Sequence, residues 1–409
     1  MKKPRWLHRE YRREVGDVLP VGDVQVVSRI FSPEPAAASF RLEALVKALV
    51  KAGQRVSVLT SLPAPGKKRH VHAHVDQLPG VYVKRVQALR DETGYIRGYL
   101  PYMSFDIPSF FRLLFSPRPQ IYVSEPPPTT GAMVRVLSAL KRRPYAYYAA
   151  DVWSDAASDA PQLVVKALRL AEGFALHGAS CVLAISDAVA SRCRDLGAQH
   201  VTLVPNGIDT DVFTDRGDMP QPVGGADPRD GDWFVYAGTY SEWQGAEIFA
   251  EAFTRIADHY PQARLLFLGQ GTSREALQRI ADAPGGEHIY FGKVSPDQAA
   301  GWQRIARACL VSIKPGNGYD FAYPTKVFAA LACNTPVLYA GVGPAKEDIE
   351  RNGLGVAAPY DVQAVANAMR SILDGTLTYA HMREWVVEHH SVAATAQKAA
   401  TAILDAIRH

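Results

Sequence analysis

The segment from Tyr319 to Lys326 combines residue types that suit the binding of an anion. Pro324 fits the first turn of a helix, where the missing N–H of proline costs nothing. The amides that follow point out of the helix start, and with the helix dipole they form an anion site, to which Lys326 adds a charge and Thr325 a hydroxyl. One interpretation is a phosphate site. The other is a helix that begins with proline and carries a surface lysine.

Two other short segments follow apolar runs that are typical of strands. Gly269 and Gly271 come directly after residues 265–268, and glycine there lets the backbone approach a ligand closely. A tight turn is the alternative interpretation. Asp151 and Asp155 follow residues 146–150, where carboxylates can bind sugar hydroxyls or act as a general base. A helix N-cap and a loop acid are the alternative.

The sequence suggests neither a metal site nor a redox site. None of the four cysteines forms a C-x-x-C pair, and their neighbours are apolar, so we expect free buried thiols. His70, His72 and His74 alternate as on one face of a strand, but Lys67, Lys68 and Arg69 stand beside them and disfavour a cation. We expect no metal and no cofactor.

Charge is distributed unevenly along the chain. Residues 1–200 carry 28 Lys and Arg against 17 Asp and Glu, a formal charge of +11, whereas residues 201–409 carry 17 against 24, a formal charge of −7. This asymmetry suggests that the first half meets an anionic partner, such as a phospholipid surface or a lipid-linked phosphate. Incidental surface charge explains the numbers equally well. Nucleic acid is not expected, because the basic residues are scattered and no binding motif accompanies them.

Short apolar runs alternate with helical patterns almost throughout, which predicts parallel strands with crossover helices in an α/β, doubly wound arrangement. We expect a basic N-terminal extension over residues 1–20 and two Rossmann-like domains over residues 21–210 and 211–389. The stretch from Asp215 to Asp232 is dense in Gly, Pro and Asp and reads as the linker between them. The tail from His381 to Ile407 is predicted to be helical.

Two such domains are expected to face a central cleft, since ligands of these sheets bind at the carboxyl ends of the strands. Asp151 and Lys326 are predicted to lie on opposite walls of that cleft. No secretory signal is visible, and the longest uncharged run, Val327 to Ala345, is interrupted by Pro336 and Gly341. We therefore expect a cytoplasmic protein, with peripheral contact at the inner face of the membrane through the basic first domain, in which Trp6 stands near Arg5 and Arg9.

Four motifs together resemble the family-4 glycosyltransferases, which are retaining enzymes with the GT-B fold. They are the segment Phe31–Arg41, the segment Val204–Asp209 with Phe213, the segment Tyr236–Thr239 with Gln244-Gly245, and Pro324-Thr325-Lys326 with Ala332–Val337. The likeness covers residues from about 23 to 409. It implies that the helix from about residue 390 to 409 packs on the first domain, and Val392, Ala393, Ala396 and Ala400 offer an apolar stripe for that contact.

The resemblance implies that a sugar moves from a nucleotide-sugar donor to a glycan, a lipid-linked or a small-molecule acceptor, without a metal ion. It implies that Lys326 and Arg41 stabilise the donor phosphate and that Asp151 orients the acceptor. It also implies donor contacts from the loop with Ala37 and Ala38 and from the second domain. The expected donor-binding residues there are Gly238, Thr239, Gln244, Gly269, Gly271, Asp320, Tyr323 and Thr325.

The chain departs from the family pattern at several donor contacts. Ala329 and Phe321 stand where the family usually has glutamates, and Thr239 and Gln244 stand where it usually has Arg and Lys. A hydrogen bond to a charged group contributes about 1.5–3 kcal/mol, so these losses would weaken the binding of an ordinary ribonucleotide sugar. A deoxynucleotide sugar, other contacts or a catalytically degenerate subunit explain them. The alternatives to transfer are a GT-B nucleotide-sugar epimerase and a glycan-binding pseudo-transferase.

Overall fold

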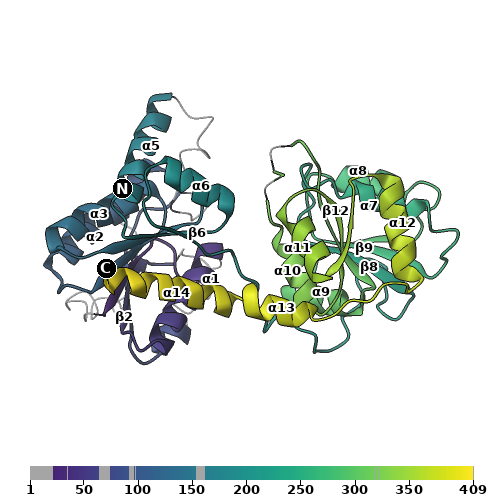
Figure 1. The fold of residues 1–409 in the computed structure, drawn as a ribbon, viewed down its shortest axis with the longest axis horizontal. Coiled ribbons are helices and arrows are strands. Elements are labelled where there is room, and N and C mark those ends of the chain that lie inside the picture. The colour runs from purple at the N-terminus through teal and green to yellow at the C-terminus, as the bar shows by residue number, and fades with distance from the viewer. Residues whose placement is uncertain are drawn as a thin grey trace, which may run out of the picture. The chain divides into compact units, whose positions relative to one another are not determined.

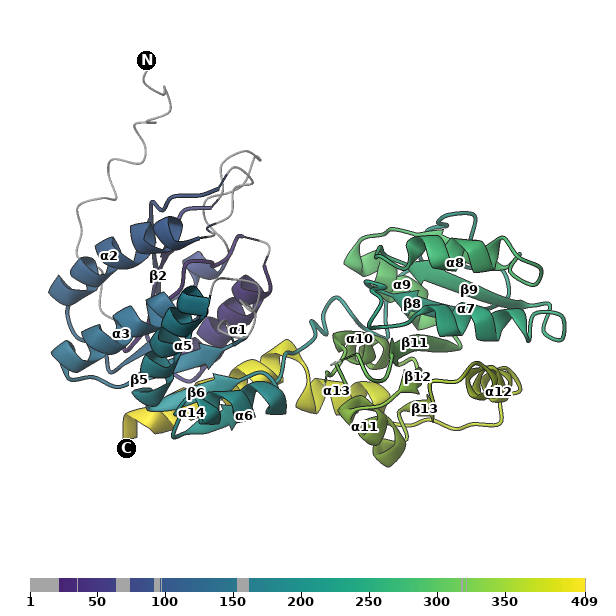
Figure 2. The ribbon, with the colours of Figure 1, turned by 90° about the horizontal axis from the view of Figure 1, so that it is seen from above.

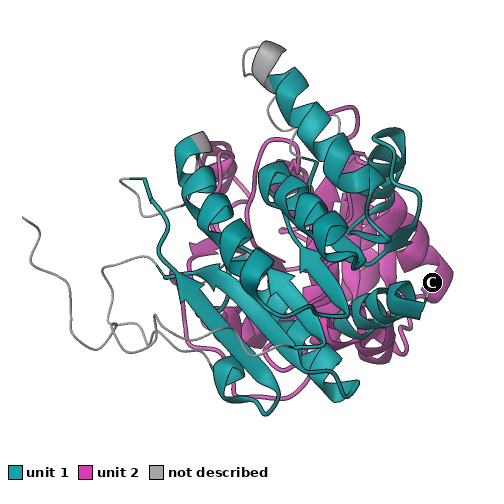
Figure 3. Cartoon of the chain, turned by 90° about the vertical axis from the view of Figure 1, so that its left-hand side faces the viewer, with its two compact units in different colours: residues 1–204, 396–409 teal, residues 205–395 magenta. Residues whose placement is uncertain are grey.

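The structure is a computed structural model that describes residues 22–34, 36–63, 74–91, 96, 98–152, 162–317, 319–320 and 322–408. The chain divides into two compact units, one of residues 1–204 with 396–409 and one of residues 205–395 (Figure 3). Each unit contains one parallel sheet between helices, so the predicted pair of doubly wound α/β domains is confirmed.

The sheet of the first unit has seven strands in the order β3-β2-β1-β4-β5-β6-β7. Strands β2 and β3 lie on one side of β1, and strands β4 to β7 lie on its other side. The strand order therefore reverses between β1 and β4, which form the switch point of the sheet. The strands are nearly all apolar because both faces are covered. Their bounds are Val24–Val27 (β1), Val56–Ser61 (β2), Val81–Val86 (β3), Ile121–Ser124 (β4), Tyr145–Ala149 (β5), Cys181–Ala184 (β6) and Val201–Leu203 (β7).

Helices cover both faces of this sheet (Figure 1). Helices α1 (Ala37–Lys51) and α14 (Val392–Arg408) share one core with one face of the sheet. Among the described residues, the other face shares its core with four helices. These are α2 (Tyr99–Phe115), α3 (Pro128–Lys141), α5 (Gln162–His177) and α6 (Asp187–Asp195), and a short 3₁₀ helix, η2, spans His74–Gln77.

The sheet of the second unit has six strands in the order β10-β9-β8-β11-β12-β13, with its switch point between β8 and β11. The bounds are Asp232–Ala237 (β8), Ala263–Leu268 (β9), Ile289–Gly292 (β10), Ala308–Ile313 (β11), Val337–Gly341 (β12) and Gly355–Ala358 (β13).

Two helical layers enclose this second sheet (Figure 2). One layer is α7 (Glu247–Thr254), α8 (Arg274–Ala281) and α12 (Val362–Leu373). The other is α9 (Pro296–Ile305), α10 (Thr325–Ala332), α11 (Pro344–Asn352) and α13 (Met382–His389). From its periodicity and helix-start signals, the sequence predicts helices over Pro296–Ile305 and Thr325–Ala332 and a strand over Ala308–Ile313. The structure has these three elements with the same bounds.

The interpretation of Asp215–Asp232 as a linker is wrong. The chain passes between the units at residues 204/205 and 395/396, against the predicted limits of 210 and 389. Arg304 of α9 donates hydrogen bonds to the carbonyls of Thr214 and Asp218, and Gln298 accepts one from the amide of Gln221. Gly, Pro and Asp indicate irregular backbone, but here that backbone is fastened to the second unit.

The predicted helical tail is two helices, α13 and α14, which are separated at His390 and Ser391. The second of them belongs to the first unit from Ala396 onward, and the side chains of Ala396, Ala399, Ala400 and Ile403 are buried in its core. Residues 1–20, including Trp6, lie outside the described residues, and so do His70, His72 and Asp155.

Candidate functional site

Three adjacent strands of the second unit end at one edge of the sheet. Gly238 and Thr239 follow β8, Gly269 and Gln270 follow β9, and Lys293 follows β10. Because the three strands are parallel neighbours, these residues are brought side by side next to the switch point. The sequence predicted the first two of these strand ends as candidate sites and missed the third.

Glycine is required at two of these strand ends. The φ angles of Gly238 and Gly269 are 126° and 141°, which L side chains rarely adopt. A Cβ on Gly269 would also overlap the carbonyl of Gly238, so the two strand ends come together only through glycine. Gly271 has a different surrounding, since its α-carbon packs on the backbone of Tyr240. Its place in the fold favours the tight-turn interpretation.

The start of helix α10 lies at the same edge. Pro324 precedes the helix in extended backbone, with no side-chain cap, and Thr325 is exposed in the first turn. The side chain of Lys326 folds back toward β8. Its Nζ donates to the Tyr236 hydroxyl at 2.6 Å and to the Thr239 carbonyl at 2.7 Å, and it lies 4.0 Å from the centre of the Tyr236 ring.

The ammonium of Lys326 has lost hydration without meeting a carboxylate in these contacts, because both acceptors are neutral oxygens. Desolvation therefore lowers the pKa of Lys326 from 10.5 to about 7. An anion bound at the start of α10 would supply the missing opposite charge and raise this pKa. Such a perturbed group in a cavity is a candidate functional residue.

Gln244 and Thr239 hold the loop after β8. The Gln244 side chain is buried, and its Oε1 accepts from the amide of Ser241 at 3.1 Å, with the hydroxyls of Tyr236 and Thr239 each 3.5 Å away. The Thr239 side chain is exposed. These two neutral residues thus order the loop around Lys326 and add no charge to it.

Tyr323 and Asp320 lie on the approach to α10. The Tyr323 ring stacks on Phe328 with centroids 4.7 Å apart, and it faces the candidate cavity. The Asp320 carboxylate accepts from the amide of Gly316 at 3.0 Å and so closes its own loop. Asp320 is not among the described residues that line the cavity, and its donor contact stays a prediction.

A cavity of about 630 Å³ joins these features within the second unit. Its described lining contains two lysines, Lys293 and Lys326, and no Asp or Glu, although residues 201–409 carry a net charge of −7. Lys293 approaches Gln270 to 3.3 Å. The wall consists of Ile208, Phe213, Ala237, Gly238, Thr239, Trp243, Gln244, Leu268, Gly269, Gln270, Lys293, Val294, Pro296, Ala299, Gln303, Tyr323, Pro324, Thr325, Lys326 and Ala329.

In the first unit, Arg41 lies on α1 at the carboxyl edge of the sheet. It forms an ion pair with Glu125, which directly follows β4, and its guanidinium lies 5.0 Å from the centre of the Tyr148 ring. Glu125 also accepts from the hydroxyl of Ser28, 3.3 Å away, at the end of β1. The charge of Arg41 is therefore largely balanced inside the unit.

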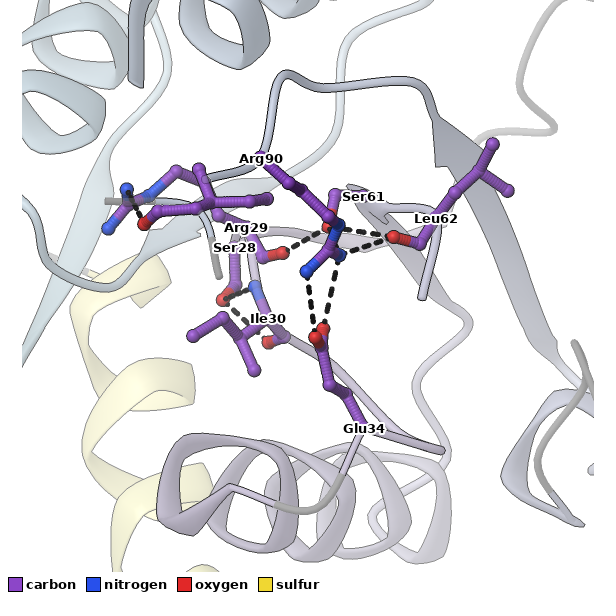
Figure 4. A network of polar contacts seen from close by, with 8 residues as sticks. Ser28, Arg29, Ile30, Glu34, Ser61, Leu62 and Arg90 are labelled. Carbon is purple, nitrogen blue, oxygen red and sulfur yellow. Dashed lines mark hydrogen bonds and ion pairs between the residues drawn. The ribbon is translucent and has the colours of Figure 1, made fainter. Parts of the chain in front are cut away.

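The loop that leads into α1 is fastened by Arg90, as Figure 4 shows. The Arg90 guanidinium donates to the Glu34 carboxylate at 2.9 Å, to the Ser61 hydroxyl at 3.0 Å and to the Leu62 carbonyl. Helix α1 begins at Ala37, and Ala38 is half-buried in its first turn. The small-residue loop is thus held against the end of β2.

Asp151 follows β5 at the same edge of the first sheet and is exposed. Its Oδ1 accepts from the amide of Val152 at 2.8 Å, which leaves the rest of the carboxylate facing solvent. In the described part of the chain no group of His, Cys, Asp and Glu has the arrangement of a metal site, and all four cysteines are free and buried. No helix of that part is long and apolar enough to cross a bilayer.

Two family models match the chain. A glycosyl transferase 4-like domain matches residues 37–207, and a glycosyl transferases group 1 domain matches residues 231–375. A comparison with functionally curated proteins gave no significant match.

Several solved structures share the two-domain fold along nearly the whole chain. Alr3699/HepE from Anabaena, in complex with UDP and glucose, is 16% identical with a TM-score of 0.57, over 94% of this chain and 96% of its own. Sucrose-phosphate synthase from Thermosynechococcus elongatus is 18% identical with a TM-score of 0.56, over 94% and 96%. WaaG, a glycosyltransferase involved in lipopolysaccharide biosynthesis, is 14% identical with a TM-score of 0.57, over 93% and 99%.

The two parallel sheets, the alternating helices and these neighbours define the fold as GT-B. The chain belongs to the group 1 glycosyltransferases, since the two family models together span most of both units.

Proposed function

We propose that the chain transfers a hexosyl group from a nucleotide-sugar donor to an acceptor alcohol with retention of anomeric configuration. The observation that carries this proposal is the cavity of the second unit. It lies at strand ends, includes the start of α10, and is lined by two lysines and no described carboxylate. That combination suits a diphosphate.

A nucleoside diphosphate sugar is the donor that this cavity fits. Its volume of about 630 Å³ falls within the 300–1,000 Å³ that small-molecule sites commonly have. The neighbour Alr3699/HepE has been solved with UDP and with UDP-glucose. These complexes support the same class of donor here.

Transfer requires stabilisation of the negative charge that develops on the leaving diphosphate. Lys326 and the first amides of α10 are fixed before the reaction, so they stabilise that charge without reorganising. We propose that these groups act without a metal ion and that Arg41 assists them. Asp151, with its carboxylate exposed after β5, would orient the acceptor hydroxyl.

The charge of the first half supports a class of acceptor. A formal charge of +11 over residues 1–200 favours a lipid-linked or otherwise anionic acceptor. We therefore place the reaction in the biosynthesis of a polysaccharide or glycoconjugate of the cell envelope, in the cytoplasm at the inner face of the membrane.

A glycan-binding pseudo-transferase is the second candidate. Ala329 presents only a methyl group to the cavity, and the buried Gln244 side chain is directed into its own loop. Both residues therefore contribute little to the binding of a nucleotide. A nucleotide-sugar epimerase remains the third. It would convert the donor without any acceptor alcohol.

Thermal shift with a panel of nucleotide sugars tests the proposal first. A donor at 100 times its dissociation constant should stabilise the protein by about 2.7 kcal/mol. Product analysis by NMR, with and without acceptor alcohols, then separates the candidates. A retained anomer linked to the acceptor supports transfer, conversion without acceptor supports the epimerase, and glycan binding without turnover supports the pseudo-transferase.

A further inference from the structure

Helices α2, α3 and α5 of the first unit form one layer on one face of the sheet. Phe105 and Leu113 of α2, Val134 of α3, and Ala175 and Leu176 of α5 are buried in the same core. Figure 2 looks onto this layer from outside. The surfaces of the three helices that face away from this core therefore share one side of the unit.

The outward side of α2 is apolar. Leu100, Ile107, Phe111 and Phe115 are exposed, and their spacing of seven and four residues places them on one side of the helix. Exposed fractions reach 71% at Leu100 and 79% at Phe115. The opposite side of α2 packs on the sheet, so this helix is apolar both inside and outside, which is typical of a helix that contacts a second apolar partner.

The two neighbouring helices continue this surface. Val136 and Leu140 of α3 are exposed, and so are Leu170 and Phe174 of α5, with Leu170 exposed to 75%. Arg135 of α3 lies 4.0 Å from the centre of the Phe174 ring, which joins the two helices on the outside. We call these eight exposed apolar residues of α2, α3 and α5 the outer face.

Cations gather where α2 and α3 end. Lys141 donates to the carbonyl of Ser116 at 2.6 Å, which ties the two helix ends together, and Arg118, Arg142 and Arg143 are exposed beside them. The charge of Arg118, after desolvation, contributes to the lowered pKa of Lys141. Exposed Phe115 and Leu140 belong to the same two helix ends.

Negative charge is missing from this surface. Residues 99–118, 128–144 and 162–177 contain eight Lys and Arg and only two acids, Asp106 and Glu172. Both acids are buried. Within the described part of these segments, the only exposed charges near the outer face are therefore cations.

We propose that the outer face of α2, α3 and α5 docks on an anionic lipid surface, with the apolar side chains entering the interface and the cations at the helix ends meeting lipid phosphates. Amphipathic surfaces bind membranes through apolar area together with attraction to anionic lipids. The proposal gives the peripheral contact of the proposed function a place on the molecule, and it rests on that function only for its setting.

Charge and shape favour lipid over a second copy of the chain. A symmetric dimer through this face would bring the same patch of cations together from both copies, which is unfavourable. The apolar residues are also spread over three neighbouring helices, as suits a broad interface. A lipid surface supplies the anions that this face lacks.

Flotation of the full chain with vesicles tests the docking surface. We expect the protein to float with phosphatidylglycerol vesicles at low salt and to float much less with phosphatidylcholine vesicles. Two double variants address the two parts of the surface separately. They are Phe111→Ser with Phe115→Ser, and Arg118→Glu with Arg142→Glu.

Each double variant should weaken partitioning into the anionic vesicles by about tenfold or more. Val387→Ser removes an exposed apolar residue of α13 in the second unit, and Lys51→Glu reverses an exposed cation on α1, which packs on the opposite face of the first sheet. Both controls should float like the parent. Because all the substituted residues are exposed or at helix ends, melting temperatures should stay close to that of the parent.

Three outcomes overturn the proposal: a parent that does not float with anionic vesicles, double variants that float like the parent, and a parent dimer in sedimentation that Phe111→Ser with Phe115→Ser converts to monomer. Donor binding by thermal shift without vesicles is measured on the same samples. Loss of flotation with unchanged donor binding supports docking, whereas flotation without any donor binding preserves docking and contradicts the proposed function.

Discussion

Arg41 in the first unit and Lys326 in the second both lie near the start of a helix at the carboxyl edge of a sheet. Arg41 forms an ion pair with Glu125. Lys326 is equally withdrawn from water but contacts only the neutral oxygens of Tyr236 and Thr239 in its hydrogen bonds. The first cation has its anion within the protein, and the second is arranged so that a ligand can supply one.

The largest effect that tests this comparison is on stability. Glu125→Ala would leave Arg41 without its partner in a mostly buried position, and breaking such a pair costs about 3–5 kcal/mol. Chemical denaturation measures it. The control is Glu43→Ala on α1, the helix that carries Arg41. It removes an exposed ion pair with Lys47 and should change stability by less than about 1 kcal/mol. Equal effects of the two variants would contradict the assigned role of Glu125.

Lys326→Ala should affect activity far more than stability. Loss of one fixed transition-state donor costs about 2–4 kcal/mol, which is about a hundredfold or more in turnover. Stability should be unchanged or slightly higher, because a lysine in the first turn opposes the helix dipole.

Lys346→Ala is the matched control for Lys326→Ala, since Lys346 also stands two residues after a proline at a helix start, in α11, but does not line the cavity. Turnover and melting temperature are measured on both variants. A Lys326→Ala enzyme within a few-fold of the parent would show that the donor phosphate is held elsewhere.

Donor affinity should depend on pH through Lys326. Its pKa in the free protein is about 7, and a bound diphosphate favours the protonated form, so affinity should fall as pH rises above about 7. The stability of the free protein should show the opposite dependence on pH. Between pH 7 and about 10 the unfolded lysine binds more protons than the folded one, so this residue makes stability rise with pH. Titration calorimetry and denaturation from pH 6 to 9 test both trends, and Lys326→Met should flatten both.

The smallest effect is expected at Lys293. This lysine is exposed after β10, and exposed charge pairs contribute about 0–1 kcal/mol. Lys293→Ala should therefore raise KM by at most about fivefold and leave kcat unchanged. Steady-state kinetics decide this, and a large loss of kcat would place Lys293 at the reacting phosphate instead.

The sequence was sufficient for the repeating elements but not for contacts between them. Periodicity and helix-start signals located α9, α10 and β11 because those signals are local. The sequence pattern did not predict helix α2, because this helix is apolar on both sides and so lacks a clear helical period of apolar residues. The segment from Asp215 to Asp232 was misread because irregular composition does not reveal that Arg304 and Gln298 fasten it.

The candidate site was predicted in part for the same reason. Gly238, Gly269 and Lys326 stand at strand or helix ends, which the sequence marks, and all three line the cavity. Lys293 follows a strand too, but it lacks a motif of its own. Gly271 and Asp320 contact the backbone of Tyr240 and the amide of Gly316, and their role in donor binding stays a prediction. The meeting of Asp151 and Lys326 across a cleft stays a prediction.

Helix α14 has a consequence for the order in which the protein is made. The core of the first unit includes Ala396, Ala399, Ala400 and Ile403, which are synthesised after the whole of the second unit. A nascent chain released up to residue 395 therefore has every strand of both sheets but an open core in the first unit. The second unit can finish folding on the ribosome, while the first, although translated earlier, is completed last.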